Sequence, residues 1–189
     1  MLSITLTNVR AFTLIELIIS IAVTSILAVI ALPNYNDFIV QMRVDNEISQ
    51  LYRTLLLTRN SAINSGSRAI LCPLNDSSEC TTQWQNELSV FVDGNNNNIF
   101  DANEQVIQIR AAITEGDSLV YGKGRNKITF NPTGSLSGLA NGTFKYCPKT
   151  NKNRARGIII ARSGRLYQSR DSNNDGIEEN RNNKKISCN

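Results

Sequence analysis

The first part of the chain combines a long apolar run with an amphipathic pattern. Residues 12–32 contain a single charged residue, Glu16, and as an α-helix this stretch is long enough to cross a hydrocarbon core of about 30 Å. After Pro33, apolar residues recur at the spacing of one helix face, at Val44, Ile48, Leu51, Leu55 and Ala62. We therefore expect one helix from about residue 13 to residue 65.

The two halves of this helix differ in character. We expect residues 12–33 to be a transmembrane or filament-core helix, and residues 34–66 to be an amphipathic helix that packs on a sheet. Gly66 follows the last periodic residue, which is a position typical of a helix C-terminus.

From residue 67 onward, short apolar runs alternate with turn residues. We expect strands at residues 69–71, 88–92, 106–109, 119–121, 128–130, 143–146, 157–161 and 166–167. Few helix-length segments separate these runs, so the sheets should be mainly antiparallel. A long helix followed by strands indicates an α+β fold, with a β-rich head over residues 67–189 that ends in a basic tail.

Charge is distributed unevenly along the chain. The net charge of +4 hides an acidic part, residues 12–120, with 5 Lys/Arg against 12 Asp/Glu, and a basic part, residues 121–189, with 14 against 4. This asymmetry favours an anionic partner. Arg10 is the one positive charge before the apolar run, which predicts that this end lies in the cytoplasm and the head outside it.

The carboxylate of Glu16 needs an explanation. A carboxylate inside a membrane segment costs about 2.5 to 3.5 kcal/mol on insertion scales, so it calls for a partner or a function. A simple membrane anchor with an accidental Glu is the alternative. No A-x-A-like cleavage site follows the apolar run, which argues against an ordinary secretory signal peptide.

The N-terminal residues resemble the processing and assembly signal of type IV pilins and type II secretion pseudopilins. Phe12 to Leu17 read FTLIEL, and Pro33 is the twenty-second residue counted from Phe12. The resemblance implies a leader over residues 1–11, cleavage by a prepilin peptidase between Ala11 and Phe12, and methylation of the new amine. Ala11 stands where the family usually has Gly. The resemblance also implies that Glu16 pairs with the amine of a neighbouring subunit.

The head resembles a narrower group, the FimT/FimU minor pilins and the H-type pseudopilin GspH. The resemblance rests on four motifs in order: Leu71-Cys72-Pro73, Trp84 with Phe91–Asp93, Ile128–Gly134, and Gly157–Arg165. It implies a minor pilin that starts in the bacterial inner membrane with a periplasmic head and joins a type IV pilus with other pilin subunits. The alternative it leaves open is an H-type pseudopilin of a type II secretion system.

Four cysteines, an even number, suit an oxidising compartment. Of the three possible pairings we favour Cys72 with Cys80 and Cys147 with Cys188, which would pin the polar tail to the sheet. A zinc site is the alternative, although the chain contains no His and no closely spaced cysteine pair.

The basic tail is the first candidate site. Lys and Arg contact phosphates without regard to sequence, and FimT-like minor pilins are implicated in binding DNA through a Gly-Arg-x-Arg motif, of which Gly164-Arg165 matches the first half. Tyr167 would share a strand face with Arg165 and stack on a base. The candidate DNA-binding residues are Lys149, Lys152, Arg154, Arg156, Arg162, Arg165, Tyr167 and Arg170. A solvated surface or a filament contact remains the alternative.

Two Asx-rich segments are candidate calcium sites. Asp93, Asn95, Asn97 and Glu104 follow the oxygen-ligand spacing of an EF-hand loop, with Asn98 at the position of the turn Gly. Asp171, Asn173 and Asp175, followed by Gly176, make the first half of such a loop. Turns that need no metal are the alternative for both.

Enzyme chemistry is poorly supported. Without His there is no Ser-His-Asp or Cys-His pair, and no P-loop or dinucleotide fingerprint occurs. We therefore expect a non-enzymatic subunit that requires no cofactor. Trp84 is expected to pack beneath the Cys72–Cys80 loop.

Overall fold

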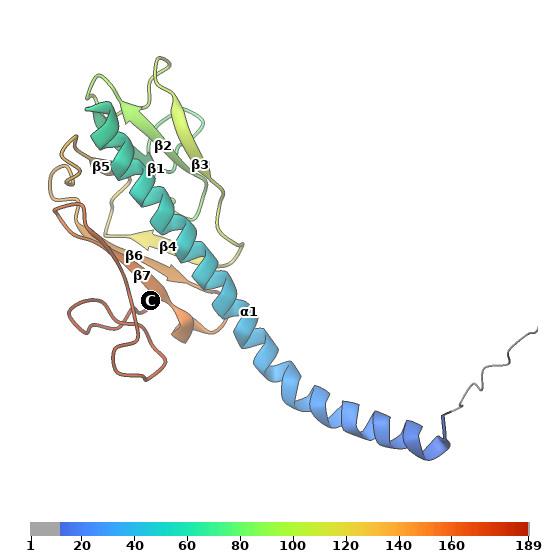
Figure 1. Ribbon diagram of the computed structural model, residues 1–189. Coiled ribbons are helices and arrows are strands. Elements are labelled where there is room, and N and C mark those ends of the chain that lie inside the picture. Colours follow the sequence, from blue (N-terminus) through green and yellow to red (C-terminus); the bar gives the residue numbers. More distant parts are fainter. Residues whose placement is uncertain (1–11, 189) are drawn as a thin grey trace, which may run out of the picture. The chain divides into compact units, whose positions relative to one another are not determined.

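The computed structural model describes residues 12–188, apart from the side chains of residues 30–34 (Figure 1). The expected leader, with Ala11, lies outside the described residues. Residues 30–33 belong to the expected segment 12–33, and residue 34 begins the expected segment 34–66. The chain divides into two compact units, one up to residue 39 and one from residue 40 onward, and each is described by itself. No helix in the described part holds a stretch that is both long enough and apolar enough to span a bilayer.

Helix α1 runs from Leu14 to Ser65, as the periodicity predicts. It ends at Gly66, whose φ of 64° is the left-handed conformation that Gly adopts readily after a helix. The predicted apolar stripe forms the buried face of its C-terminal part, because Val44, Ile48, Leu51, Leu55 and Ala62 are all buried.

Within the described residues, eight strands form two antiparallel sheets. The first has the order β3-β2-β1-β5 and the second the order β4-β6-β7-β8. The strands of the first sheet are Arg68–Cys72 (β1), Leu88–Asp93 (β2), Val106–Arg110 (β3) and Ile128–Phe130 (β5). Those of the second are Ser118–Tyr121 (β4), Gly142–Cys147 (β6), Arg156–Ile160 (β7) and Leu166–Gln168 (β8), with a 3-10 turn η1, Lys152–Arg154, before β7. The α+β prediction is confirmed, and each predicted strand lies within two residues of the observed one.

One hydrophobic core joins α1 to both sheets, and Figure 1 shows the C-terminal part of α1 lying across them. Trp84 belongs to this core. Its ring contacts Tyr121 and Phe144 edge-on, at centroid distances of 5.7 and 5.1 Å, and its indole N–H donates to the carbonyl of Arg125 at 2.7 Å. The expectation that Trp84 packs beneath the Cys72–Cys80 loop is therefore wrong. The disulfide packs on the other face of β1, with Ile70 and Phe91.

Ion pairs fix α1 to the sheets. Glu47 pairs with the buried Arg110 of β3, and Arg43 pairs with Asp117 at 3.1 Å. Burial raises the pKa of Glu47 above its ordinary value, although the Arg110 guanidinium opposes this shift. The Tyr146 hydroxyl donates to Asp117, and burial together with this bond raises the pKa of Tyr146. The Arg110 pair fixes the first sheet to the helix, and the Asp117 contacts fix the second sheet, which carries the basic residues.

Candidate functional site

Glu16 closes the N-terminus of α1. Its Oε2 accepts hydrogen bonds from the backbone N–H of Thr13 at 3.0 Å and from the Thr13 hydroxyl at 3.1 Å, while the Glu16 N–H donates to that hydroxyl at 3.3 Å. Thr-x-x-Glu is the sequence signature of such a capping box, a signal that the sequence analysis did not use. Both Glu16 and Phe12 are exposed in the isolated chain, so they are accessible to another subunit.

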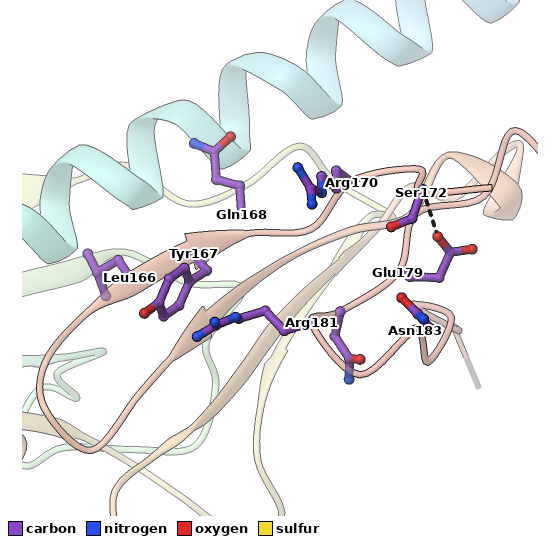
Figure 2. A pocket seen from close by; sticks show the side chains of 9 residues that line it. Leu166, Tyr167, Gln168, Arg170, Ser172, Glu179, Arg181 and Asn183 are labelled. Atoms are coloured by element: carbon purple, nitrogen blue, oxygen red, sulfur yellow. Dashed lines mark hydrogen bonds between the residues drawn. The ribbon is translucent and has the colours of Figure 1, made fainter. Parts of the chain in front are cut away.

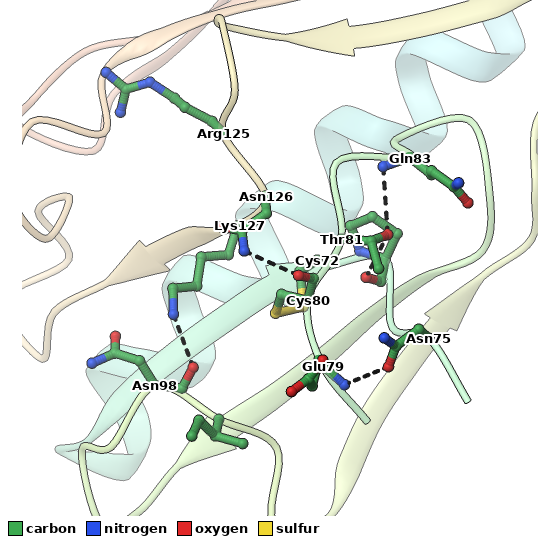
Figure 3. The surroundings of a disulfide bond; sticks show 12 residues. Cys72, Asn75, Glu79, Cys80, Thr81, Gln83, Asn98, Arg125, Asn126 and Lys127 are labelled. Atoms are coloured by element: carbon green, nitrogen blue, oxygen red, sulfur yellow. Dashed lines mark hydrogen bonds between the residues drawn. A yellow bond between two sulfur atoms is a disulfide. The ribbon is translucent and has the colours of Figure 1, made fainter. Parts of the chain in front are cut away.

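Both favoured disulfides are present. Cys72 pairs with Cys80 and Cys147 with Cys188, which removes the zinc alternative for these cysteines. Figure 3 shows the first bond, beside which the Asn126 amide donates to the carbonyl of Cys80 and the Lys127 ammonium donates to the carbonyl of Asn98. The second bond joins the end of β6 to the C-terminal tail and so holds the tail against the second sheet.

The predicted basic residues divide into different environments. Arg156 forms ion pairs with Asp45 of α1 and with Glu178, so it ties the helix, the sheet and the tail together and is not available to a ligand. Lys149 and Lys152 line a separate hollow beside the Cys147–Cys188 bond. Arg162 and Arg165 flank the turn between β7 and β8, where the Ala161 N–H donates to the carbonyl of Arg165 at 2.9 Å.

A polar hollow on the edge strand β8 brings together Tyr167, Arg170 and Arg181 (Figure 2). The Arg181 guanidinium lies over the Tyr167 ring, 4.2 Å from its centroid, as in a cation–π contact. Arg181 covers one face of the Tyr167 ring, so the expected stacking on a base would use the other face. Arg181 was missed as a site residue because it lies eleven residues beyond Arg170, after the Asx-rich segment.

Three arginines on or near β8 form no ion pair among the described residues. They are Arg165, Arg170 and Arg181, and all three are exposed. Arg165 and Arg170 lie at the two ends of β8, and Arg181 stacks on the ring between them. The arrangement presents positive charge along a sheet edge, which suits an extended polyanion.

The glycines of the two family motifs have a packing role. A Cβ on Gly164 would lie 1.8 Å from the carbonyl oxygen of Gly134, so the two turns that hold these residues touch backbone to backbone. The same Gly134 carbonyl accepts from Arg59 of α1 at 2.9 Å, and the Leu136 N–H donates to the carbonyl of Arg162 at 3.0 Å. Gly164 is therefore required to place the turn that carries Arg162 and Arg165.

The first Asx-rich segment, which we call loop 93–104, folds around the fully buried carboxylate of Asp93. Its two oxygens accept from the N–H groups of Asn97 and Asn98, at 3.1 and 2.9 Å. Glu104 closes the loop, because it accepts from the N–H groups of Gly94 and Asp101 at 2.9 and 3.2 Å. Asp101, which was not among the predicted ligands, accepts from the side-chain amides of Asn95 and Asn97, both at 2.7 Å.

The second segment, which we call loop 171–179, repeats this conformation. Asp171 accepts from the N–H groups of Asp175 and Gly176 at 3.2 and 2.8 Å. Glu179 accepts from the N–H of Ser172 at 2.9 Å (Figure 2). Glu179, which was not among the predicted ligands, thus closes the loop that holds the predicted Asp171, Asn173 and Asp175.

Lys185 contacts this loop, with its ammonium 2.6 Å from Asp175. Their hydrogen bond lowers the pKa of Asp175 and raises the pKa of Lys185. The next acidic residue, Glu178, faces away from the loop to Arg156 and Ser169, and burial raises its pKa.

Two family profiles match the sequence. The profile described as Type II transport protein GspH covers residues 47–164, and that described as Prokaryotic N-terminal methylation motif covers residues 6–32. The fold is similar to that of the type IV minor pilin FimU of Pseudomonas aeruginosa PAO1, with a TM-score of 0.53 and 16% identity, over 66% of this chain and 86% of that one. At this identity the likeness establishes the fold alone.

A second solved structure is the minor pseudopilin EpsH from the type 2 secretion system of Vibrio cholerae. It has a TM-score of 0.49 and 15% identity, over 67% of this chain and 95% of that one.

Proposed function

The chain belongs to the GspH family of minor pilins and pseudopilins, and from that premise we propose that it is a minor pilin of a type IV pilus whose head binds DNA. Subunits of this family are structural and non-enzymatic. The N-terminal methylation motif marks a membrane-anchored prepilin that is processed by prepilin peptidase and assembles with other pilins into a pilus or pseudopilus. Two parts of this proposal need testing: that the chain joins a type IV pilus, and that its head binds DNA.

The observation that carries DNA binding is the set of exposed arginines along β8. Arg165, Arg170 and Arg181 have no carboxylate partner among the described residues, whereas the neighbouring Arg156 is neutralised by Asp45 and Glu178. Exposed cations on one sheet edge attract a phosphate backbone by releasing its counterions. The cation–π contact of Arg181 with Tyr167 holds its guanidinium in place, which lowers the entropy cost of a phosphate contact.

DNA binding is tested with the full-length protein in a neutral detergent, by fluorescence anisotropy of a labelled duplex across a salt series. We expect the affinity to fall steeply with salt, and each of Arg165→Gln, Arg170→Gln and Arg181→Gln to reduce the log–log salt slope by about 1. Arg53→Gln is the matched control, because Arg53 is exposed on α1 and forms no ion pair among the described residues. Binding that ignores salt and all three substitutions would exclude this surface.

Assembly rests on Glu16, for which we propose a partner in the neighbouring subunit. Leader removal would leave a positive amine on Phe12, and in a low-dielectric bundle a carboxylate is its natural partner. The capping box offers a second role for Glu16, and two variants separate them. Thr13→Ala breaks the cap and keeps the charge, whereas Glu16→Gln removes the charge and keeps an acceptor for Thr13.

We expect Glu16→Gln to insert into the membrane but to be missing from sheared pili, as detected by immunoblotting, and Thr13→Ala to be incorporated. Incorporation of Glu16→Gln at the normal level would refute the pairing.

The second candidate is the H-type pseudopilin of a type II secretion system, which is favoured by the match to the Type II transport protein GspH profile. Deletion of the gene distinguishes the two. Loss of pili and of DNA uptake with normal protein secretion supports the pilus, and retention of secreted enzymes inside the cell supports the secretion system.

A further inference from the structure

The C-terminal tail contains a cluster of carboxylates, one of which, Glu179, lines the hollow in Figure 2. Asp171, Asp175 and Glu179 each place a carboxylate oxygen within 4.8 Å of the others. Only this group of three acidic, His or Cys residues has such a geometry within the described part of the chain. Loop 93–104 has a longer match to the EF-hand spacing, but its carboxylates do not converge in this way.

Glu179 supplies the observation that the cluster alone does not. Its side chain is 3% exposed, and Oε2 accepts the Ser172 N–H, which turns the carboxylate into the loop. The other oxygen, Oε1, is buried and accepts no hydrogen bond among the described residues. A buried carboxylate oxygen without a partner is costly, so its position beside two further carboxylates favours a cation ligand.

The charges around the loop suit a divalent ion. Glu178 forms an ion pair with Arg156, outside the cluster. The three remaining carboxylates carry three negative charges, and among the described residues they form one ion pair, between Asp175 and the Lys185 ammonium. Two negative charges are left over, which is the charge that one divalent cation balances.

The type of donor selects among divalent ions. Carboxylates at loop positions 1, 5 and 9, an Asn amide at position 3 and the Ile177 carbonyl at position 7 make an all-oxygen set without His or Cys. Calcium takes six to eight oxygens in a flexible arrangement, whereas magnesium demands a strict octahedron and keeps several waters. Zinc prefers nitrogen and sulfur ligands.

We propose that loop 171–179 is a calcium site in which Asp171, Asn173, Asp175 and Glu179 are the side-chain ligands. The ion binds the orphaned oxygen of Glu179 and replaces the Lys185 ammonium on Asp175. Because the backbone of Glu179 pairs with that of Arg170, the ion also fixes the segment that leads from Arg170 to Arg181. This assignment does not depend on DNA binding.

The test is a calcium titration of the full-length protein in neutral detergent, after removal of bound metal with EGTA, by isothermal titration calorimetry. We expect saturable binding with a dissociation constant of roughly 10⁻⁴ to 10⁻³ M or tighter, the range of extracellular calcium modules. Glu179→Gln and Asp175→Asn should each weaken binding at least about 10-fold, because each removes one anionic ligand. Asp175 is exposed, so its variant keeps the test informative if Glu179→Gln fails to fold.

The matched control is Glu104→Gln, which changes the corresponding residue of loop 93–104, the one that accepts from the N–H of Gly94. It should leave the calcium affinity of loop 171–179 unchanged. The proposal is overturned if the wild type shows no binding at millimolar calcium, if both tail variants bind as well as the wild type, or if magnesium binds as tightly as calcium.

Discussion

Loop 93–104 and loop 171–179 share a backbone conformation but differ in how the carboxylate of their closing Glu is hydrogen-bonded. In both, residue 1 accepts from the N–H groups of residues 5 and 6, and residues 4 and 6 have positive φ. In both, a Glu accepts from the N–H of residue 2. The difference is that both oxygens of Glu104 are satisfied by backbone N–H groups, whereas one oxygen of Glu179 is left without a partner.

The surroundings explain the difference. Loop 93–104 joins two hydrogen-bonded strands, β2 and β3, and is anchored by Phe100, whose ring meets Phe91 edge-on at 5.0 Å. Loop 171–179 follows the edge strand β8 and is held by a two-residue bridge, by Arg156 and by a distant disulfide. Loop 93–104 satisfies both oxygens of Glu104, whereas loop 171–179 leaves one oxygen of Glu179 without a partner, and this is where we propose the ion. The calcium proposal therefore rests on the bonds that the ligands already make and not on the spacing of ligand residues alone.

The largest expected effect on stability comes from removing the disulfide that holds the tail with loop 171–179. The Cys147–Cys188 bond spans 41 residues, and its removal by a double Cys→Ser substitution should cost about 4 kcal/mol of unfolding free energy in a chain-entropy model. The Cys72–Cys80 bond spans 8 residues, and its removal should cost about 2.5 kcal/mol. Denaturant unfolding of both double variants measures these values.

Calcium titration of the same variants sharpens the comparison. We expect the variant without Cys147–Cys188 to lose calcium affinity and the variant without Cys72–Cys80 to keep it. Equal calcium binding in the two would show that loop 171–179 needs no distant support.

A smaller effect separates the two carboxylates at position 1. Asp93 is fully buried, and Asp93→Asn replaces one acceptor oxygen by an NH2 group that faces the N–H of Asn97 or Asn98. We expect this substitution to lower the free energy of unfolding by about 1.5 to 3 kcal/mol in calcium-free buffer. Asp171 is half-buried and water can replace its bonds, so Asp171→Asn should cost about 1 kcal/mol. The measurement is urea unfolding in EGTA.

Repeating that measurement with calcium should reverse the ranking. Saturating calcium at 100 times the dissociation constant stabilises a folded chain by about 2.7 kcal/mol, and only Asp171→Asn should forfeit this gain. If Asp93→Asn forfeits it instead, the ion binds in loop 93–104.

The smallest expected effect concerns backbone conformation. Gly176 has a φ of 82° and open space around its missing Cβ, so Gly176→Ala should cost about 1 kcal/mol through the left-handed conformation alone. Gly94 also has open space but no positive φ, so Gly94→Ala should stabilise by about 0.4 to 1 kcal/mol by restricting the unfolded chain. Thermal unfolding of the two variants in EGTA measures both changes. A loss of stability in Gly94→Ala would contradict the claim that the backbone at Gly94 accepts a Cβ without strain.

Local order was determined by the sequence. The bounds of α1, its buried stripe, the strands and the α+β class follow from hydrophobic periodicity, because each depends on neighbours within a few residues along the chain. The even number of cysteines, the tail position of Cys188 and the short gap between Cys72 and Cys80 favoured, among three possible pairings, the one that is observed. The positions of both Asx-rich loops were also visible from residue spacing alone.

Tertiary structure decided which of the candidate residues are available to contact a ligand. Arg156 looks like any other basic residue in the tail, and only the docking of α1 on the second sheet brings Asp45 to it across more than a hundred residues. Trp84 joined the core between helix and sheets, and not the disulfide cluster, for the same reason. Arg181 reached Tyr167 because the tail folds back along β8. Whether a carboxylate oxygen has a hydrogen-bond partner depends on which donors the fold brings near it. Glu104 receives a backbone N–H at each oxygen, whereas Glu179 receives one at a single oxygen, and we propose that a cation binds the other.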